Sequence, residues 1–335
     1  MKVNSFIGDG VNGAATRARA LEAAGLDSIA TAEVAHDPFL PLTLAAEHTE
    51  RIELMTAIAV AFARTPMALA TIAHDLNALS RGRFILGLGS QVKGHIERRF
   101  GMPWSAPAKR MREYVLALHA IWDSWHEGKP LDFRGEFYSH TLMTPRFTPE
   151  DVSFGRPRIG VAAVGPLMTQ AAAEVADALI CHRFSTERYL REVTLPAVED
   201  ALARNTRPRR DFEVVFRPFT AIVHDDAEFA RARKELSWHI AFYASTPPYR
   251  GLLEMHGWGD LQTEAQASVK ADRWSEIGDL IDDEVFNAFA VVGDARHVAD
   301  TLAQRCEGVI DRVSVDVHDA RPEDIEVLVS RLKRV

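Results

Sequence analysis

The fold is indicated most clearly by residues 51–90, "RIELMTAIAVAFARTPMALATIAHDLNALSRGRFILGLGS". The part "IELMTAIAV" is a continuous apolar run, which is typical of a parallel strand that is covered on both faces. Thr65 and Pro66 then supply an N-cap and an N1 proline for a helix. A second buried strand, "RFILGLG", follows that helix. The stretch therefore predicts a strand–helix–strand unit with parallel strands.

The same order of strand and helix repeats on both sides of this stretch. Apolar strands are expected at "KVNSFIG", "LDSIAT", "RIGVAAVGP", "DALICH", "EVVFRPFTAIV" and "RVSVDV", and a helix follows each of them. About eight strands in alternation with helices indicate a (β/α)8 barrel. An open, doubly wound sheet is the alternative, but its Gly-rich nucleotide signature is missing.

The chain shows no change of composition that would mark a linker between domains. We therefore expect one barrel domain over residues 1–335. Two stretches break the alternation, at about 129–157 and about 246–280, and both are rich in helix-breaking or aromatic residues. We expect these two stretches to be irregular insertions into the barrel.

Composition excludes several classes of protein. The formal net charge of −8 argues against a nucleic-acid-binding surface, which would be basic. No apolar run approaches the roughly 20 residues that span a bilayer, and "MKVNSFIGDG" indicates a strand rather than a signal peptide. Cys181 and Cys306 do not make a disulfide framework, so the expected compartment is the cytoplasm.

Motif spacing excludes several chemistries as well. Gly87-x-Gly89 is followed by Val92 where a dinucleotide fingerprint needs its third glycine, and Gly94 is followed by His95 where a P-loop needs its lysine. The thirteen histidines never show H-x-H or H-E-x-x-H spacing, so no metal site is expected. The serine-hydrolase motif G-x-S-x-G is also missing from "GLGSQ".

In a barrel the active site is built from loops at the carboxyl ends of the strands. The four informative loops are "AEVAHDPFLP", "AVAFARTP", "GLGSQVKGH" and "AAVGPLMTQ". With the block strand–"ART-P"–helix–"S-x-GR"–strand–"LG-x-G" and the segment "LIDDEVFNAFAVVGDARHVADTL", they resemble the luciferase-like family of flavin- and deazaflavin-dependent oxidoreductases. The matching segments cover nearly the whole chain in family order. The likeness is greatest to the branch that uses coenzyme F420.

The resemblance implies a barrel with the cofactor ring at its C-terminal mouth. The ring would rest on a bulge after strand three that contains a non-prolyl cis peptide, at Ala57-Ile58 in this sequence. The turn Gly89-Ser90-Gln91 would line the ring, and the helix start at Gly165-Pro166 would hold the cofactor phosphate. Without the resemblance, "TAIAV" could be barrel packing and Gly165-Pro166 an ordinary helix start. The cofactor-binding residues so implied are Asp37, Ala57, Ile58, Ala59, Val60, Arg64, Gly89, Ser90, Gln91, Lys93, His95, Val164, Gly165, Leu167 and Met168.

The acid/base residues of the family are only partly present. Asp37 matches the first carboxylate of F420-dependent sugar-phosphate dehydrogenases, but Pro38 stands at the histidine position and Val92 at the glutamate position. Sugar-phosphate oxidation is therefore not expected. The catalytic candidates are His36, Asp37, His95 and His182. We prefer His36 as proton donor because a histidine side chain titrates near neutral pH.

The expected function is hydride transfer between coenzyme F420 and a small, apolar organic substrate under the aromatic insertion. F420 is preferred to FMN because Arg64, Lys93, Arg98 and Arg99 could bind its acidic tail. An FMN-dependent luciferase-like monooxygenase is the alternative, and a non-catalytic flavin-binding barrel is the alternative of another class. We also expect a homodimer that buries helices of the first half of the barrel.

Overall fold

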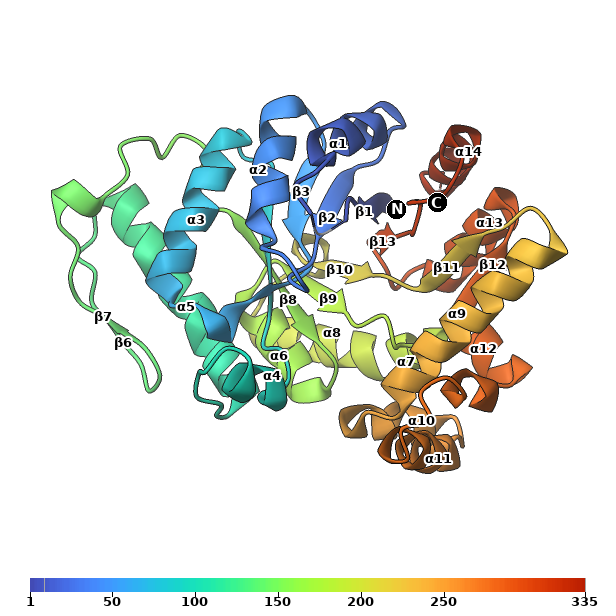
Figure 1. Ribbon diagram of the computed structural model, residues 1–335. Helices are drawn as coiled ribbons and strands as arrows, with labels where there is room; N and C mark the ends of the chain where they lie inside the picture. The colour runs from blue at the N-terminus through green and yellow to red at the C-terminus, as the bar shows by residue number, and fades with distance from the viewer. Residues whose placement is uncertain (9, 335) are drawn as a thin grey trace. The chain divides into compact units, whose positions relative to one another are not determined.

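A computed structural model describes residues 1–8 and 10–334 of the chain (Figure 1). These residues group into two compact units. Unit I comprises Ile7–Ile180 and Val198–Glu213, and unit II comprises Met1–Phe6, Cys181–Ala197 and the chain from Val214 on. We describe the two units separately, and the single domain predicted for residues 1–335 stays a prediction.

The sheet of unit I is parallel. Strand β2 (Ser28–Thr31) pairs with β3 (Glu53–Thr56), β3 with β5 (Phe84–Gly89), and β5 with β8 (Arg158–Ala163). The short strand β4 (Ala59–Val60) also pairs with β5, at Leu88 and Gly89, which are nearer the carboxyl end of β5 than the residues that pair with β3. All residues of β2 and β5 are buried, as expected for strands covered on both faces.

Helices follow these strands at the predicted places. The helices of unit I are α1 (Ala14–Ala23), α2 (Phe39–His48), α3 (Pro66–Leu79), α4 (Lys93–Arg98), α5 (Pro107–Glu127) and α6 (Pro166–Val175). Thr65 caps α3 by accepting a hydrogen bond from the Ala68 N–H at 3.3 Å, and Pro66 stands at N1. Both parts of the predicted helix start are confirmed. Helices α1, α2 and α3 lie side by side in Figure 1.

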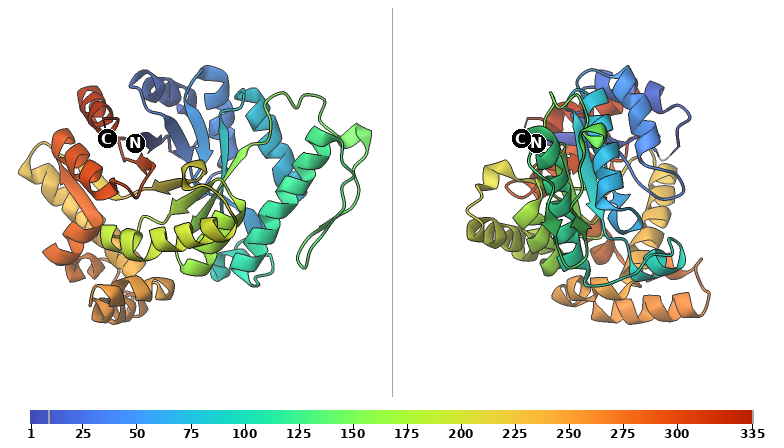
Figure 2. Two further views of the ribbon diagram at one scale, coloured as in Figure 1. Left: turned by 180° about the vertical axis from the view of Figure 1, so that it is seen from behind. Right: turned by 90° about the vertical axis from the view of Figure 1, so that its left-hand side faces the viewer.

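The first insertion, at about 129–157, contains a small hairpin of β6 (Phe133–Arg134) and β7 (Ser139–His140). In Figure 2 its loop extends away from α5. The Glu113 carboxylate of α5 accepts hydrogen bonds from three consecutive backbone N–H groups, those of Glu136, Phe137 and Tyr138, at 2.7–2.9 Å. One carboxylate thus fixes the turn of the hairpin to the helix.

The sheet of unit II contains β1 (Lys2–Phe6), β13 (Arg312–Ser314) and β10 (Glu213–Phe216), all parallel, with β13 in the middle. The prediction of one strand over "EVVFRPFTAIV" is wrong at its centre. The strand ends at Phe216, and a separate strand β11 (Phe219–Ile222) pairs with β12 (Ala290–Gly293) instead. Pro218 explains the break, because it has no N–H to donate to a ladder.

The second insertion is more regular than expected. Residues 246–280 contain α10 (Arg250–Met255) and α11 (Gly259–Lys270), so the prediction of an irregular stretch is wrong there. The other helices of unit II are α7 (Glu187–Tyr189), α9 (Asp226–Ala244), α12 (Asp283–Phe289), α13 (Ala295–Cys306) and α14 (Pro322–Leu332), while α8 (Leu195–Arg204) crosses the unit boundary. Helices α9 and α13 lie beside the β11–β12 pair (Figures 1 and 2).

With β9 (Ala178–Cys181), the chain has eight parallel strands that follow one another in the order of a closed (β/α)8 barrel. The predicted fold class is confirmed, and the open, doubly wound alternative is wrong. Over residues 1–8 and 10–334, no helix is long and apolar enough to cross a membrane.

Candidate functional site

Most of the predicted site residues lie at one edge of the unit I sheet. Because β2, β3, β5 and β8 are parallel, the loops that follow them meet at their common carboxyl edge. These loops carry His36 and Asp37, the segment 57–60, the turn 89–91 and the segment 164–168. The structure therefore brings the predicted residues of unit I to the carboxyl edge of its sheet.

The bulge after β3 has the backbone that the resemblance implied. The peptide bond between Ala57 and Ile58 is cis. The Ala57 N–H donates to the Thr31 carbonyl at 2.7 Å, and the Ile58 carbonyl accepts from the Glu33 N–H at 3.0 Å. Both bonds join the bulge to the segment at the end of β2. Ala57 and Ile58 are partly exposed, whereas Ala59 and Val60 are buried.

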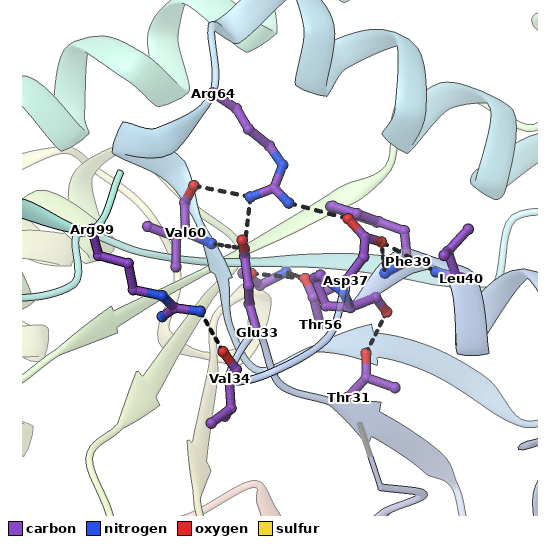
Figure 3. A network of polar contacts seen from close by, with 12 residues as sticks. Thr31, Glu33, Val34, Asp37, Phe39, Leu40, Thr56, Val60, Arg64 and Arg99 are labelled. Atoms are coloured by element: carbon purple, nitrogen blue, oxygen red, sulfur yellow. Dashed lines mark hydrogen bonds and ion pairs between the residues drawn. The ribbon is translucent and has the colours of Figure 1, made fainter. Parts of the chain in front are cut away.

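Glu33 is a site residue that the sequence analysis missed. Its carboxylate is only 8% exposed and accepts hydrogen bonds from the Val60 N–H at 2.7 Å and from Arg64 Nη1 at 2.6 Å (Figure 3). It thereby fixes the exit of the bulge. Its place was the available signal, because a charged residue just beyond the carboxyl end of a barrel strand is a site candidate.

Asp37 and Arg64 belong to the same network. Asp37 Oδ2 lies 3.2 Å from Arg64 Nη2, and Asp37 Oδ1 accepts from the Phe39 N–H at 2.8 Å at the start of α2 (Figure 3). The Arg64 guanidinium is therefore held between two carboxylates, those of Glu33 and Asp37. Its charge is largely compensated within the protein, which leaves less of it for the cofactor tail.

The glycines of "LGLGS" serve close packing. A Cβ on Gly87 would lie 1.8 Å from the Thr56 carbonyl oxygen, and one on Gly89 would lie 2.7 Å from the Ile58 side chain. Thr56 also exchanges two hydrogen bonds with Gly87, at 2.7 and 2.8 Å. Both glycines are needed because β3 and the bulge approach β5 so closely.

The turn after β5 is held by its own side chains. Ser90 Oγ donates to the Gln91 carbonyl at 3.1 Å, and Gln91 Oε1 accepts from the Val92 N–H at 2.9 Å. Gln91 has a φ of 59°, a left-handed conformation that is uncommon for a side chain of this kind. Such conformations occur often at ligand sites.

The basic residues after this turn lie on the surface. Lys93 and His95 are exposed in α4, and Lys93 Nζ is 3.9 Å from Glu97 Oε1. Arg99 donates a hydrogen bond to the Val34 carbonyl, between the loops after β5 and β2 (Figure 3). Arg99 thus connects two loops of the site, and Lys93 is the more accessible cation.

The helix start after β8 lies beside an open groove. Gly165 precedes Pro166, the first residue of α6, and apart from its two chain neighbours no described atom lies within 4 Å of a Cβ built on Gly165. The groove, of about 690 Å3, lies between the starts of α5 and α6 and has a mainly apolar lining that includes Leu167 and Met168. Leu167 is 72% exposed. An anion could therefore approach the N–H groups of this helix start without obstruction.

His182 lies in unit II, and its contacts argue against proton transfer. Its Nδ1 accepts a hydrogen bond from the Phe184 N–H at 3.1 Å, so the ring proton is assigned to Nε2, which lies 3.1 Å from Tyr249 Oη. Burial, and secondarily the Arg183 charge, lowers the pKa of His182 to about 4. His182 is therefore neutral at neutral pH and orients the Tyr249 hydroxyl.

The described residues fit a flavin-like cofactor better than a metal ion. No cluster of three or more His, Cys, Asp or Glu side chains that could hold a metal occurs within residues 1–8 and 10–334. The bulge offers two partly exposed apolar side chains, and the start of α6 has backbone N–H groups of the kind that bind a phosphate. The roles of all the predicted residues in binding and catalysis stay predictions.

A family model described as luciferase-like monooxygenase matches residues 6–312. The chain belongs to the luciferase-like monooxygenase family. Over 334 residues it is 50% identical to an uncharacterised protein of Mycobacterium tuberculosis, with 100% of this chain and 98% of that one covered. It is 28% identical to a putative coenzyme F420-dependent oxidoreductase of the same species over 298 residues, which are 85% of this chain and 84% of the relative.

Solved structures of other proteins share the fold. The coenzyme F420-dependent tetrahydromethanopterin reductase from Methanopyrus kandleri matches with a TM-score of 0.81 at 19% identity, over 99% of this chain and 98% of that one. A type II Baeyer–Villiger monooxygenase from Pseudomonas putida in complex with FMN matches with a TM-score of 0.70 at 17% identity, over 99% and 97%. The chain is thus an enzyme of an oxidoreductase family. The relative from Mycobacterium tuberculosis and the reductase are described as F420-dependent, and the monooxygenase was solved with FMN.

Proposed function

We propose that the protein transfers a hydride between coenzyme F420 and a small, mainly apolar organic substrate. The observation that carries the proposal is the bulge at Ala57–Ile58, which is fixed by Glu33 at the carboxyl edge of the unit I sheet. The relatives named above support the choice of F420, since one of them is described as a coenzyme F420-dependent oxidoreductase. When bound, the deazaflavin supplies the hydride chemistry, and the protein supplies binding and orientation.

The residues of the site have distinct proposed tasks. Ala57 and Ile58 would support the ring, because they are the partly exposed residues of the bulge. Gly165 and the start of α6 would bind the phosphate, because backbone N–H groups and the helix dipole favour an anion there. Lys93 is the proposed partner of the acidic tail, because it is the more accessible cation of the loop after β5.

Proton transfer is assigned to the exposed residues after β2. His36 and Asp37 are both solvent-exposed there, as general acids that serve a bound substrate must be reachable. Asp37 is already engaged with Arg64 and with the start of α2. We therefore propose His36 as the proton donor, with His95 as the second candidate.

A specific observation favours one alternative. A structural neighbour with the same fold was solved in complex with FMN, and the ring platform of the bulge would serve either cofactor. The difference lies in the tail, which only F420 extends toward basic residues. An FMN-dependent monooxygenase is therefore the second candidate function.

The proposal is tested by disturbing the ring platform through its glycine neighbour. In Gly89→Ala the new Cβ would meet the Ile58 side chain at 2.7 Å, so Ile58 must shift. We expect cofactor binding to weaken about tenfold or more, because near contacts tolerate little displacement. Gly251→Ala in α10 is the matched control, since apart from its chain neighbours and the adjacent helix backbone no described atom lies within 4 Å of its Cβ. If the Gly89 and Gly251 variants bound each cofactor with equal affinity, the proposal that the bulge supports the cofactor ring would be wrong.

A further inference from the structure

Unit II contains a polar cavity that the proposed function does not use. It has a volume of about 520 Å3, which is within the range of small-molecule sites. Residues after β10 and β13 and one face of α9 line it. Because β1, β13 and β10 are parallel, the cavity lies at the carboxyl edge of this sheet, where barrel enzymes place their ligand-binding loops.

Two arginines and one aspartate form the polar centre of the cavity lining. Arg183 Nη2 lies 3.3 Å from Asp316 Oδ2, and Arg217 Nη2 lies 2.6 Å from Asp316 Oδ1. One carboxylate therefore faces two guanidinium groups. Guanidinium groups stay protonated in proteins, so the group of three carries a net positive charge of one.

Both arginines are held in place by aromatic rings. The Arg183 guanidinium lies 4.1 Å from the centre of the Phe219 ring, and that of Arg217 lies 3.9 Å from the centre of the Phe6 ring. Stacking of this kind fixes the plane of a guanidinium and leaves its edge free to bind an anion. The two forks are thus preorganised before any ligand arrives.

Hydrogen-bonding capacity remains at this centre. Within the described part of the chain, the buried Nε atoms of Arg183 and Arg217 have no hydrogen-bond partner. A buried charged donor without a partner is costly, and an incoming anion would relieve that cost. Burial, and then the charge of Arg217, also lowers the pKa of Arg183, as expected where positive charge is not fully compensated.

The rest of the lining has mixed charge. It contributes Arg231 and Arg321 and the three acidic residues Glu228, Glu235 and Asp319, so these five side chains carry a formal charge of −1. The net positive charge belongs to the group of Arg183, Arg217 and Asp316. His239, also in the lining, has a pKa lowered by burial and by the nearby Arg183, so it is neutral and offers a hydrogen bond.

We propose that this cavity binds a small organic molecule through an anionic group, a carboxylate or a phosphate, which Arg183 and Arg217 hold. The inference does not depend on the cofactor, because binding to the apoprotein is sufficient to test it.

The test measures binding of succinate and of inorganic phosphate to the apoprotein by calorimetry, with ionic strength held constant by sodium chloride. We expect one of the two anions to bind in a one-to-one ratio, and which one binds assigns the ligand as a carboxylate or a phosphate. Arg217→Met should weaken that binding about tenfold or more, the loss of a charge-assisted contact. Binding of neither anion would overturn the proposal.

Arg233→Met is the matched control. Arg233 stacks 4.2 Å from the Phe286 ring and pairs with Asp283 at 2.8 Å, but it lies outside the cavity lining. Its replacement should leave anion binding unchanged. Equal losses in the Arg217 and Arg233 variants would overturn the proposal.

A second variant distinguishes an anion site from a purely structural ion cluster, and it remains informative if the arginine variant fails to fold. Asp316→Asn removes the carboxylate that competes with the ligand and keeps the size of the side chain. An anion site predicts tighter anion binding in this variant than in the wild type. Unchanged or weaker anion binding would show that Arg183 and Arg217 only form ion pairs with Asp316 and do not bind a ligand.

Discussion

Replacement of Glu33 by Gln tests whether this carboxylate holds the bulge. The wild-type carboxylate accepts from the Val60 N–H at 2.7 Å and from Arg64 Nη1 at 2.6 Å. Both bonds end on Oε2, so Gln can keep an acceptor oxygen there, but its amide is neutral and the ion pair with Arg64 is lost. The change therefore removes charge-assisted bonding from a largely buried place.

The size of the effect follows from the exposure of the partners. The side chains of Glu33 and Arg64 are 8% and 19% exposed. Breaking a fully buried pair costs about 3–5 kcal/mol, and hydrogen bonds to charged groups are worth about 1.5–3 kcal/mol. Because water reaches Arg64, and Asp37 remains as its partner, we expect the free energy of unfolding to fall by about 2 kcal/mol.

Asp37→Asn is the matched control for this experiment. The Asp37 side chain is 40% exposed and lies 3.2 Å from Arg64, so loss of its charge should cost at most about 1 kcal/mol. Asn is as good as Asp at a helix start, so the bond to the Phe39 N–H is kept. This variant therefore isolates the more exposed of the two ion pairs.

Urea unfolding gives the stability of both variants, and amide hydrogen exchange reports on the bulge itself. In Glu33→Gln the Val60 amide should lose protection more than the amides of β5 do. If both variants unfold within about 0.5 kcal/mol of the wild type, a difference typical of a surface change, Glu33 does not hold the bulge.

Arg83→Met should lower the free energy of unfolding by about 2–4 kcal/mol, because Arg83 donates five hydrogen bonds to residues 46–52 and Ser80. Cofactor affinity should not change, because Arg83 precedes β5. A loss below about 1 kcal/mol in urea unfolding would contradict this. The free energy of unfolding of the wild type should fall as the pH decreases from about 6.5 to about 4. Over this range His182 is protonated in the unfolded chain, whereas in the folded state its lowered pKa keeps it neutral. His182→Gln should show a shallower loss over the same pH range, and identical pH profiles of unfolding would refute this. Sedimentation at micromolar concentration should show a homodimer, since Met67, Ala68 and Ala78 of α3 are not buried in the chain, whereas a monomer alone would count against it.

The sequence predicts the fold well where local rules decide it. Continuous apolar runs identify buried parallel strands, and the Thr65-Pro66 pair identifies the start of α3. The seventh strand was predicted too long, because the effect of Pro218 was outweighed by the apolar residues on both sides of it. The helices α10 and α11 were missed because their Pro- and Gly-containing boundaries resemble a loop.

The site was predicted less completely, since its contacts join distant parts of the chain. Glu33 meets Val60 and Arg64 only after β2 and β3 pair, and Tyr249 meets His182 across a separation of 67 residues. The place of Gly87 and Gly89 at the end of a strand was predictable, but the reason for them was not. Only the pairing of β3 with β5 reveals that Thr56 and Ile58 leave no room for a Cβ.

A titration of the apoprotein with F420 and, separately, with FMN tests directly whether the protein uses a deazaflavin. Fluorescence or calorimetry gives both dissociation constants under the same buffer conditions. We expect one-to-one binding of F420 at micromolar concentration or tighter, and weaker binding of FMN, because only F420 carries the acidic tail that Lys93 can bind. Micromolar binding of FMN without binding of F420 would contradict the proposed use of F420 and make the FMN-dependent monooxygenase the better interpretation.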